Sequence, residues 1–492
     1  MRQQLPAIII VVPLMISIVN SLAGRRQANA AFSLTLAAMS ACLVCSVMTL
    51  DTVGSNGIIR YQFGGWPSPM GIEYRIDHLN AFLPVLISFI GLVTCIHAKK
   101  SVEKELPDKI SLFWSLFLLL VTGLLGVSIT GDLFNLFVFL EVASLTGYAL
   151  IAVGNRRATV AGIRYLIIGT IGASLYLLGV GYLYLATGTL NMGDLSQLLP
   201  ELYDSKTVLT GFAFILIGLA IKSALFPMHV WLPDAYTHAP SAASALVAPL
   251  TTKVMAYVMI RIMFTVFQPD FSMVRATDIM VFMGTAAVLF GAVMALSQTD
   301  FKRMLSYVIV AEIGYIIGGI GVANAVALKG AVFHIINGAT MMACLFLTAG
   351  QVMYRKGGHH INDFKGIFKT MPFTAAVFTI GALAVIGVPP TCGFFSKWYL
   401  LLGGIQADQW GFVAALLICT LVNIALFFRI FDKGLFIHAH GREQTVPACN
   451  SDSGEVPLIM LIPAVLTAVV IVLTGIFNQF IIDEVLRFSI LP

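Results

Sequence analysis

Long apolar segments recur from one end of the chain to the other, and short polar loops separate them. A helix that crosses a bilayer needs about 20 apolar residues in a row, and roughly fourteen segments meet that requirement. They lie near residues 5–23, 30–50, 79–98, 110–130, 132–153, 160–187, 207–228, 241–267, 273–297, 304–322, 325–354, 371–402, 411–431 and 456–481. The pattern predicts an all-α polytopic protein of the cell (inner) membrane.

Composition supports this fold class. Of 492 residues, 58% are hydrophobic and only 11% are charged, which excludes an ordinary soluble domain. The first apolar segment is long and contains prolines, so we interpret it as a span, with a cleaved signal peptide as the alternative. The net charge of +5 lies in the loops, where it indicates topology and not nucleic-acid binding.

Positive charges alternate between loops. Pairs such as Lys99–Lys100, Arg156–Arg157 and Lys302–Arg303 follow odd-numbered spans, whereas the loops after even-numbered spans carry fewer Lys and Arg residues. Because cytoplasmic loops are rich in Lys and Arg, this alternation predicts that both termini lie on the extracytoplasmic side. The external loop 51–78 contains the alternating stretch GIEYRID, which is consistent with a short hairpin.

The sequence predicts no cofactor and no metal site. The seven cysteines are scattered, and Cys42 and Cys45 form a CxxC inside an apolar segment without a second pair. No P-loop and no GxGxxG motif is present. The loop histidines suggest no third metal ligand.

The stretch 220–253, AIKSALFPMHVWLPDAYTHAPSAASALVAPLTTK, contains two lysines within apolar sequence, Lys222 and Lys253. A lysine near the middle of a bilayer costs at least ~2.5–3.5 kcal/mol, so such residues usually serve a function. Four prolines interrupt the same stretch, and broken hydrophobic helices expose backbone and charge to a buried polar path. The stretch therefore predicts part of an ion pathway.

Three more charges lie inside apolar segments. These are Glu141 in the fifth span, Glu312 in the tenth, and Lys397 in the twelfth, just after Pro389–Pro390. Each glutamate precedes a lysine by two spans, which predicts the pairs Glu141–Lys222 and Glu312–Lys397. Four independent structural salt bridges are the alternative.

This spacing favours two five-helix repeats of inverted topology, a common construction in transporters. The predicted units are 1–109 (helices 1–3), 110–270 (first repeat, helices 4–8), 271–435 (second repeat, helices 9–13) and 436–492 (a loop and helix 14). Helices 7 and 12 are expected to be broken.

A proton path through these charges has a simple switch. A nearby carboxylate holds a buried lysine in its charged form, so moving that carboxylate away favours release of the proton. Histidine titrates near neutral pH and suits a relay. We therefore predict that Lys253 and His238, assigned to the eighth span, and His334 in the eleventh carry protons between the halves.

Four stretches resemble one family. DLFNLFVFLEVASLTGYALIA, KSALFPMHVWLPDAYTHAPSAASALVAPLTTKVMAYVMIR, QTDFKRMLSYVIVAEIGYI and GVPPTCGFFSKW are similar to the antiporter-like proton-pumping subunits. That family includes large membrane subunits of respiratory complex I, subunits of Mrp-type sodium/proton antiporters and their counterparts in membrane-bound hydrogenases. The length without a C-terminal extension is most similar to the D-type subunit of Mrp antiporters or its hydrogenase relative.

The resemblance implies a fourteen-helix fold with broken helices 7 and 12. It also implies roles for Glu141 and Lys222 as the switch pair, Lys253 as the central relay and Lys397 as the terminal lysine. His334 matches the family's eleventh-helix histidine.

The chain departs from the family at three positions. Gly338 and Met342 stand where the resemblance implies a second histidine and a lysine, and Glu312 stands where many relatives have a neutral residue or histidine. Two interpretations remain open: Glu312 makes the second half a glutamate–lysine unit like the first, or the second half is impaired and one half-channel serves.

The predicted function is a proton-translocating subunit of a multisubunit cation/proton antiporter, coupled to Na+ exchange. The alternative is a non-redox pumping subunit of a redox complex, either NADH:quinone oxidoreductase-like or hydrogenase-like. Whether the assembly is an enzyme stays open. The expected partners are other membrane subunits, H+, Na+ and the lipid bilayer, with no nucleic acid.

Overall fold

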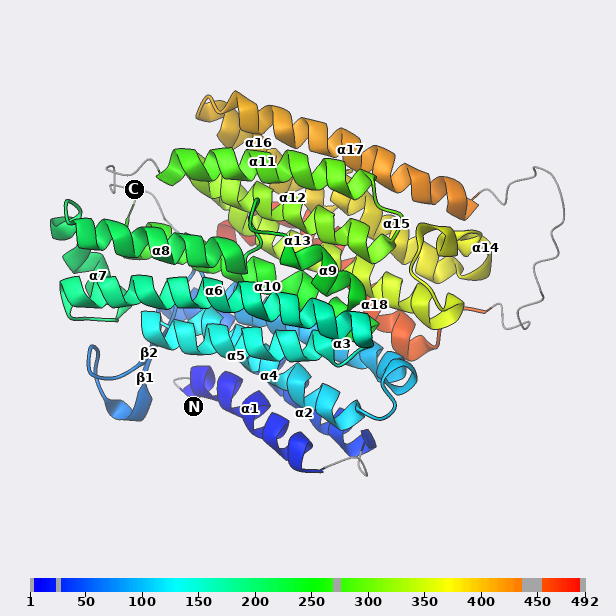
Figure 1. Cartoon of the computed structure of the whole chain (residues 1–492), viewed down its shortest axis with the longest axis horizontal. Coiled ribbons are helices and arrows are strands. Elements are labelled where there is room, and N and C mark those ends of the chain that lie inside the picture. Colours follow the sequence, from blue (N-terminus) through cyan, green and yellow to red (C-terminus); the bar gives the residue numbers. More distant parts are fainter. Residues whose placement is uncertain (1–3, 24–27, 269–275, 436–453, 487–492) are drawn as a thin grey trace.

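The computed structural model of the chain describes residues 4–23, 28–268, 276–435 and 454–486. In these ranges, twelve helices are long and apolar enough to cross a membrane. They are α1 (Leu5–Ala23), α2 (Ala28–Asn56), α3 (Phe82–Glu105), α4 (Ile110–Ile129), α5 (Leu133–Ala152), α6 (Arg156–Thr187), α10 (Ser241–Arg261), α11 (Ala276–Leu296), α12 (Phe301–Val322), α13 (Ala325–Lys356), α17 (Trp410–Leu435) and α18 (Leu458–Ile476). The helices lie side by side along one direction (Figure 1).

Two further spans are broken. The first consists of α8 (Lys206–Lys222) and α9 (Trp231–His238), and the second of α15 (Pro372–Ile386) and α16 (Cys392–Gln406). Pro227 lies in the first break and Pro389–Pro390 in the second, and proline has no N–H to continue a helix. With the twelve unbroken helices, the two pairs make fourteen spans among the described residues, so the predicted fold class and both breaks are confirmed.

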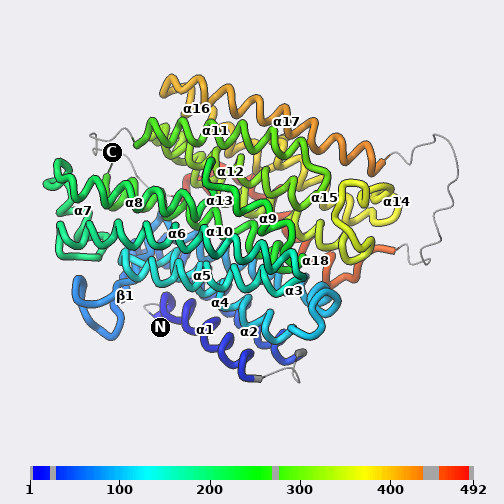
Figure 2. Tube along the Cα trace, in the orientation of Figure 1, coloured from blue at the N-terminus to red at the C-terminus, as the bar shows by residue number. Residues whose placement is uncertain are grey.

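Short elements close the ends of the bundle. The strands β1 (Ile59–Gln62) and β2 (Glu73–Ile76) and the helix α7 (Met192–Leu198) lie at one end, and α14 (Ile367–Thr370) at the other (Figure 2). A short helix, α19 (Asn478–Phe480), follows α18 and leads into a π-helical turn, Ile481–Val485. The repeat boundaries stay a prediction, and of the predicted unit 436–492, residues 436–453 and 487–492 lie outside the described residues.

Three helices form the centre of the bundle. All 21 residues of α10 are buried, as are all residues of α12 except Arg303 and most of α13. The outer helices α1, α2, α6, α11 and α17 instead expose large apolar side chains, such as Phe282 and Leu421. Lipid can cover an apolar surface, but a charge on α10 or α12 must find its partner inside the protein.

The predicted hairpin is confirmed. β1 and β2 pair in antiparallel register, with Ile59 opposite Ile76 and Gln62 opposite Glu73. Directly after β2, Asp77 accepts two hydrogen bonds from Arg261 at the end of α10, at 2.7 and 2.8 Å. This fork ties the hairpin to the central helix.

Asp77 lies outside the membrane-spanning helices. Burial alone would raise the pKa of its carboxyl group, but the charge and hydrogen bonds of Arg261, with Arg75 nearby, outweigh burial and lower the pKa below its usual value. Because the pKa is lowered on folding, the contact with Arg261 stabilises the folded protein fully at pH values above about 3.9, the pKa of Asp in an unfolded chain. This stabilisation is lost as the pH falls through the lower pKa of the folded state.

An Arg261→Met chain is expected to lose ~3 kcal/mol of stability at neutral pH, because removing one partner of a buried pair leaves the other unpaired. Thermal unfolding in detergent measures the loss, which should shrink in acid. The control is Arg60→Met, whose exposed side chain lies 3.7 Å from Glu73 and should contribute at most about 1 kcal/mol. Equal losses for both variants would contradict an anchoring role for Arg261.

Candidate functional site

The first charged cluster lies between α5 and the end of α8. Lys222, 3% exposed, donates hydrogen bonds to Glu141 at 3.1 Å, Ser144 at 2.8 Å and Tyr148 at 3.2 Å. The three partners are spaced i, i+3 and i+7 on α5, so they share one helix face. Lys222 is also the last residue of α8, where the partial negative charge of a helix C-terminus favours a cation. The predicted Glu141–Lys222 pair is confirmed.

The second cluster is a buried ion pair in the centre. Lys253 on α10 donates to Glu312 on α12 at 2.8 Å, and the two side chains are only 1% and 2% exposed. The predicted pairing of Glu312 with Lys397 is therefore wrong, because Glu312 pairs with the central lysine instead.

Gly338 explains how this pair fits. A Cβ atom at this position of α13 would lie 3.3 Å from Lys253 Cε and 3.4 Å from Glu312 Oε2. Such contacts are tighter than ordinary packing, so a longer side chain would press on the pair. A glycine at 338 and an acid at 312 therefore belong to one arrangement.

Lys397 uses the second helix break. Its ammonium group donates to the carbonyls of Val385 at 2.7 Å and Ile386 at 3.2 Å. These carbonyls lie in the last turn of α15, where the break leaves them without helical partners. The break thus provides acceptors for the lysine in place of a carboxylate. The ammonium group also lies 5.3 Å from the centre of the Tyr315 ring.

His334 lies between the second cluster and Lys397. Its Nδ1 atom is 2.9 Å from Ser396 Oγ, and its ring contacts the ring of Tyr315 at 5.2 Å. His334 precedes Gly338 by one helical turn on α13, which is about 6 Å along the axis. Position 338 lies beside the Lys253–Glu312 pair, and Ser396, the partner of His334, directly precedes Lys397. The buried charged groups therefore form a row in which His334 follows the ion pair and precedes Lys397.

Several polar atoms in this region are buried and have no hydrogen-bond partner among the described residues. They include Glu312 Oε1, His334 Nε2 and Asn337 Oδ1. Leaving such an atom unpaired costs about 1–3 kcal/mol, and ordered water is the usual remedy in protein interiors. The polar atoms on α12 and α13 are thus suited to holding water between Glu312 and His334.

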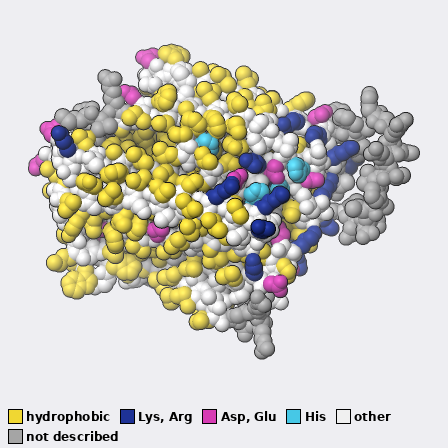
Figure 3. Space-filling model, viewed as in Figure 1, with side chains coloured by type: hydrophobic (Ala, Val, Ile, Leu, Met, Phe, Trp, Pro, Cys, Tyr) yellow, Lys and Arg dark blue, Asp and Glu magenta, His cyan; other side chains and the backbone are white. Residues whose placement is uncertain are grey.

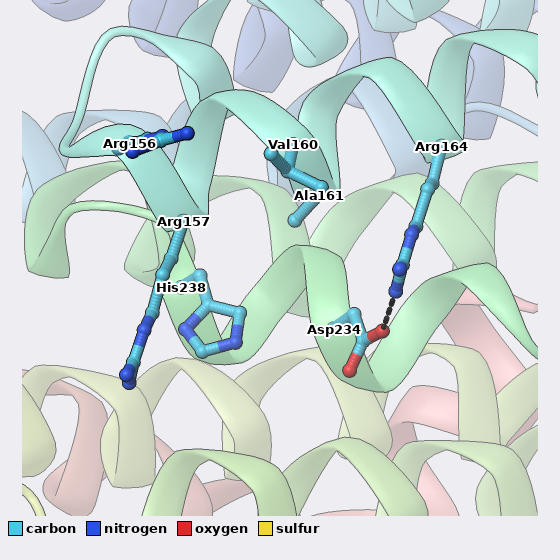
Figure 4. A pocket seen from close by; sticks show the side chains of 7 residues that line it. All are labelled: Arg156, Arg157, Val160, Ala161, Arg164, Asp234 and His238. Atoms are coloured by element: carbon cyan, nitrogen blue, oxygen red, sulfur yellow. Dashed lines mark hydrogen bonds and ion pairs between the residues drawn. The ribbon is translucent and has the colours of Figure 1, made fainter.

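His238 does not lie on this row. The sequence pattern places it in the eighth span, but α9 ends at His238 and Pro240 precedes the next helix, so it belongs to the broken seventh span. Its side chain lies in a surface pocket with Arg157 and Asp234 (Figure 4). A role in carrying protons between the halves does not follow from this position.

Sequence reasoning missed the neutral partners. Ser144 and Tyr148 hold Lys222, and Ser396 and Tyr315 hold His334. The helical spacing from Glu141 is a usable signal for the first two, because positions i+3 and i+7 share its face. Tyr315 lies three residues after Glu312 on α12, so the same kind of spacing marks it, whereas no sequence signal marks Ser396 on α16 as a partner of His334. In the described part of the chain, no group of three or more His, Cys, Asp or Glu side chains could hold a metal ion.

Comparisons with known proteins agree with this architecture. A family model described as "NADH:quinone oxidoreductase/Mrp antiporter, TM" matches residues 130–422. The N-type subunit of the NADH-quinone oxidoreductase of Desulforudis audaxviator is 43% identical, over 100% of this chain and 99% of the relative. The D-type subunit of the Na+/H+ antiporter of Alkalihalophilus pseudofirmus is 33% identical, over 87% of this chain and 86% of the relative.

Solved structures also match nearly the whole fold, and a respiratory complex is among them. A chain of the membrane-bound sulfane sulfur reductase, an archaeal respiratory membrane complex, superimposes with a TM-score of 0.90 at 30% identity. The match covers 98% of this chain and 96% of that one. The similar chain is part of a respiratory membrane complex.

Proposed function

We propose that this chain, which belongs to the NADH:quinone oxidoreductase/Mrp antiporter transmembrane family, translocates protons along its central row of buried charges. It is a multi-pass, antiporter-like membrane subunit of a multisubunit complex. The proposed path runs from Glu141 and Lys222, through Lys253 and Glu312, to His334 and Lys397.

The Lys253–Glu312 pair is the observation that carries the proposal. A fully buried ion pair gives little net stability, because the cost of removing two charges from water offsets their attraction. Here it joins α10, which we assign to the first repeat, to α12 of the second. A proton that moves from Lys253 to Glu312 neutralises both groups together, so the two halves can pass a proton without leaving an unpaired charge.

The neighbouring groups support transfer beyond this pair. Glu312 Oε1, Asn337 Oδ1 and His334 Nε2 are buried atoms that bridging water could contact, and Lys397 follows beyond His334. At the other end, Lys222 has three acceptor groups, one of which is the partly exposed Glu141. Opening the Glu141–Lys222 contact would favour proton release from the lysine and is the proposed switch.

Two assemblies use such a chain. The 43% identity over the full length of an NADH-quinone oxidoreductase subunit favours a redox-driven complex. The 33% identity to a Na+/H+ antiporter subunit supports the second candidate, in which Na+ exchange is the driver. In both, we propose that the loops containing Arg156–Arg157 and Lys302–Arg303 face the cytoplasm and that both termini face the other side.

Inside-out vesicles that contain the complete assembly test the proposal. We expect NADH to cause uptake of protons, measured with a pH-sensitive dye, and a protonophore to abolish the signal. A pulse of Na+ without reductant should cause no response; if it drives proton movement instead, the antiporter candidate replaces the redox one. Vesicles that respond to neither driver, while the assembly is intact on a native gel, would refute proton translocation.

A further inference from the structure

A basic pocket opens where α6 begins and α9 ends. It is lined by Arg156, Arg157, Val160, Ala161, Arg164, Asp234 and His238, and its volume is about 460 Å³. That volume lies within the usual range for small-ligand sites. On this face of the molecule, Lys, Arg and His side chains gather in one region, whereas apolar side chains cover most of the remaining surface (Figure 3).

The pocket has unused positive charge. Asp234 is shared by Arg164 at 3.0 Å and Arg303 at 3.5 Å, so its negative charge is already compensated. Arg156 and Arg157 are exposed and form no hydrogen bond or ion pair with a described side chain. Figure 4 shows Arg157 extending beside His238 and Arg156 extending the other way. Arg157 thus lines the pocket beside His238, and the exposed Arg156 must change rotamer to contact the same phosphate. Each guanidinium group can donate two N–H hydrogen bonds to a phosphate group.

An apolar groove continues along the same helix. It is lined by Leu166, Ile167, Thr170, Ile171, Ser174, Leu175 and Leu178, and its volume is about 470 Å³. Ile167 and Ile171 are 54% and 52% exposed, and the Thr170 hydroxyl is already bonded to the Leu166 carbonyl at 2.8 Å. The groove therefore offers dispersion contacts and almost no polar ones.

The dimensions match one kind of ligand. From Arg157 the helix rises about 14 Å to Leu166 and about 21 Å to Ile171, at 1.5 Å per residue. One bilayer leaflet with its headgroups is about 21 Å deep, which is half the usual total of about 40–45 Å. A phosphate bound at the arginines would thus place an acyl chain against the first turns of the groove, as far as Ile171, inside the same leaflet.

We propose that this pocket and groove bind an anionic phospholipid, with the phosphate at Arg156 and Arg157 and one acyl chain against α6. A soluble phosphate compound would leave the groove uncovered, and an apolar peptide would leave the arginines unpaired. The site is independent of the proposed proton path. It lies next to that path, however, since Tyr165 follows Arg164 and packs on Tyr148, which holds Lys222.

The test uses the purified complete assembly, delipidated in a neutral detergent and titrated with phosphatidylglycerol. Bound lipid is measured by mass spectrometry, and stabilisation by the midpoint of thermal unfolding. We expect saturable binding that weakens at least about tenfold in an Arg156→Gln/Arg157→Gln chain, because each basic residue contributes roughly 1 kcal/mol. Ile167→Trp/Ile171→Trp, which fills the groove, should weaken binding as well.

The control is the double variant Arg60→Gln/Lys206→Gln, which removes two exposed charges at the other end of the bundle and should bind lipid normally. Phosphatidylcholine and inorganic phosphate should bind weakly. Inorganic phosphate that competes fully, with no effect of the groove variant, would assign the pocket to a free anion and overturn the lipid site. Unchanged lipid binding in the arginine variant would overturn it too, as would protection of this face by another subunit in the assembly.

Discussion

A Lys222→Arg chain is expected to assemble normally and to translocate protons about 100-fold more slowly than the unchanged protein, which is within the usual effect of removing a positioned proton-transfer group. Arginine keeps the positive charge beside Glu141, so the ion pair and the contact with the end of α8 are retained. A guanidinium group does not release its proton at any relevant pH. The substitution therefore separates the structural role of the charge from its role in proton transfer.

Proton uptake by inside-out vesicles is the measurement, with the thermal unfolding midpoint of the purified assembly as the readout for structure. The matched control is Lys206→Arg, at the exposed start of the same helix, which should change neither quantity. Ser144→Ala removes one of the three acceptors of Lys222 and should have an intermediate effect on the rate.

A normal rate in Lys222→Arg would show that this lysine only balances charge, and the proposed switch would fail. A slow rate that accompanies a large drop in the unfolding midpoint would point to damage by the bulkier side chain. In that case Lys222→Met, compared at the same level of assembly, separates the two causes, because methionine is no bulkier than lysine and cannot carry a proton. A slow rate in Lys222→Met would assign the lost proton translocation to the missing proton carrier, and a normal rate would assign it to damaged packing.

The spans and their breaks could be predicted because their causes are local. A run of apolar residues must become a helix in a bilayer, since only a helix satisfies its own backbone. Pro227 and Pro389–Pro390 stop that helix wherever the chain folds. The lysines beside the breaks have a physical reason that the sequence only suggested, because the end of α8 and the free carbonyls of α15 both favour a cation.

The pairing of charges could not be predicted, because it depends on which helices pack together. Spacing assigns Glu312 to Lys397, but both lysines lie near α12, and the glutamate contacts Lys253. In the sequence, Gly338 stands where the resemblance implies a basic residue. In the structure, the missing side chain at this position leaves the space that the Lys253–Glu312 pair occupies. His238 is misplaced by the sequence pattern for a simpler reason: Pro240 moves the start of α10 beyond it.

A double-mutant cycle at Lys253 and Glu312 is expected to separate the contribution of this buried pair to stability from its contribution to proton translocation. Lys253→Met alone leaves a buried carboxyl group unpaired, and Glu312→Gln alone leaves a buried ammonium group unpaired, so each should destabilise the protein by ~3–5 kcal/mol. The double variant Lys253→Met/Glu312→Gln contains no buried charge at this site. Replacing a buried pair by neutral groups of similar size is often neutral or stabilising, so the double variant should recover its unfolding midpoint.

Proton translocation should behave differently from stability. If the pair carries protons, the double variant regains its fold but still translocates protons about 100-fold more slowly, because neither Met nor Gln accepts a proton. If the pair is only structural, the rate should return together with the unfolding midpoint. A Gly338→Ala chain should have an intermediate rate of proton translocation. Its Cβ atom presses on the Lys253–Glu312 pair but removes no charge, so it should slow translocation less than the double variant does. Recovery of both quantities in the double variant would therefore remove Lys253 and Glu312 from the path and leave the two halves without their buried connection.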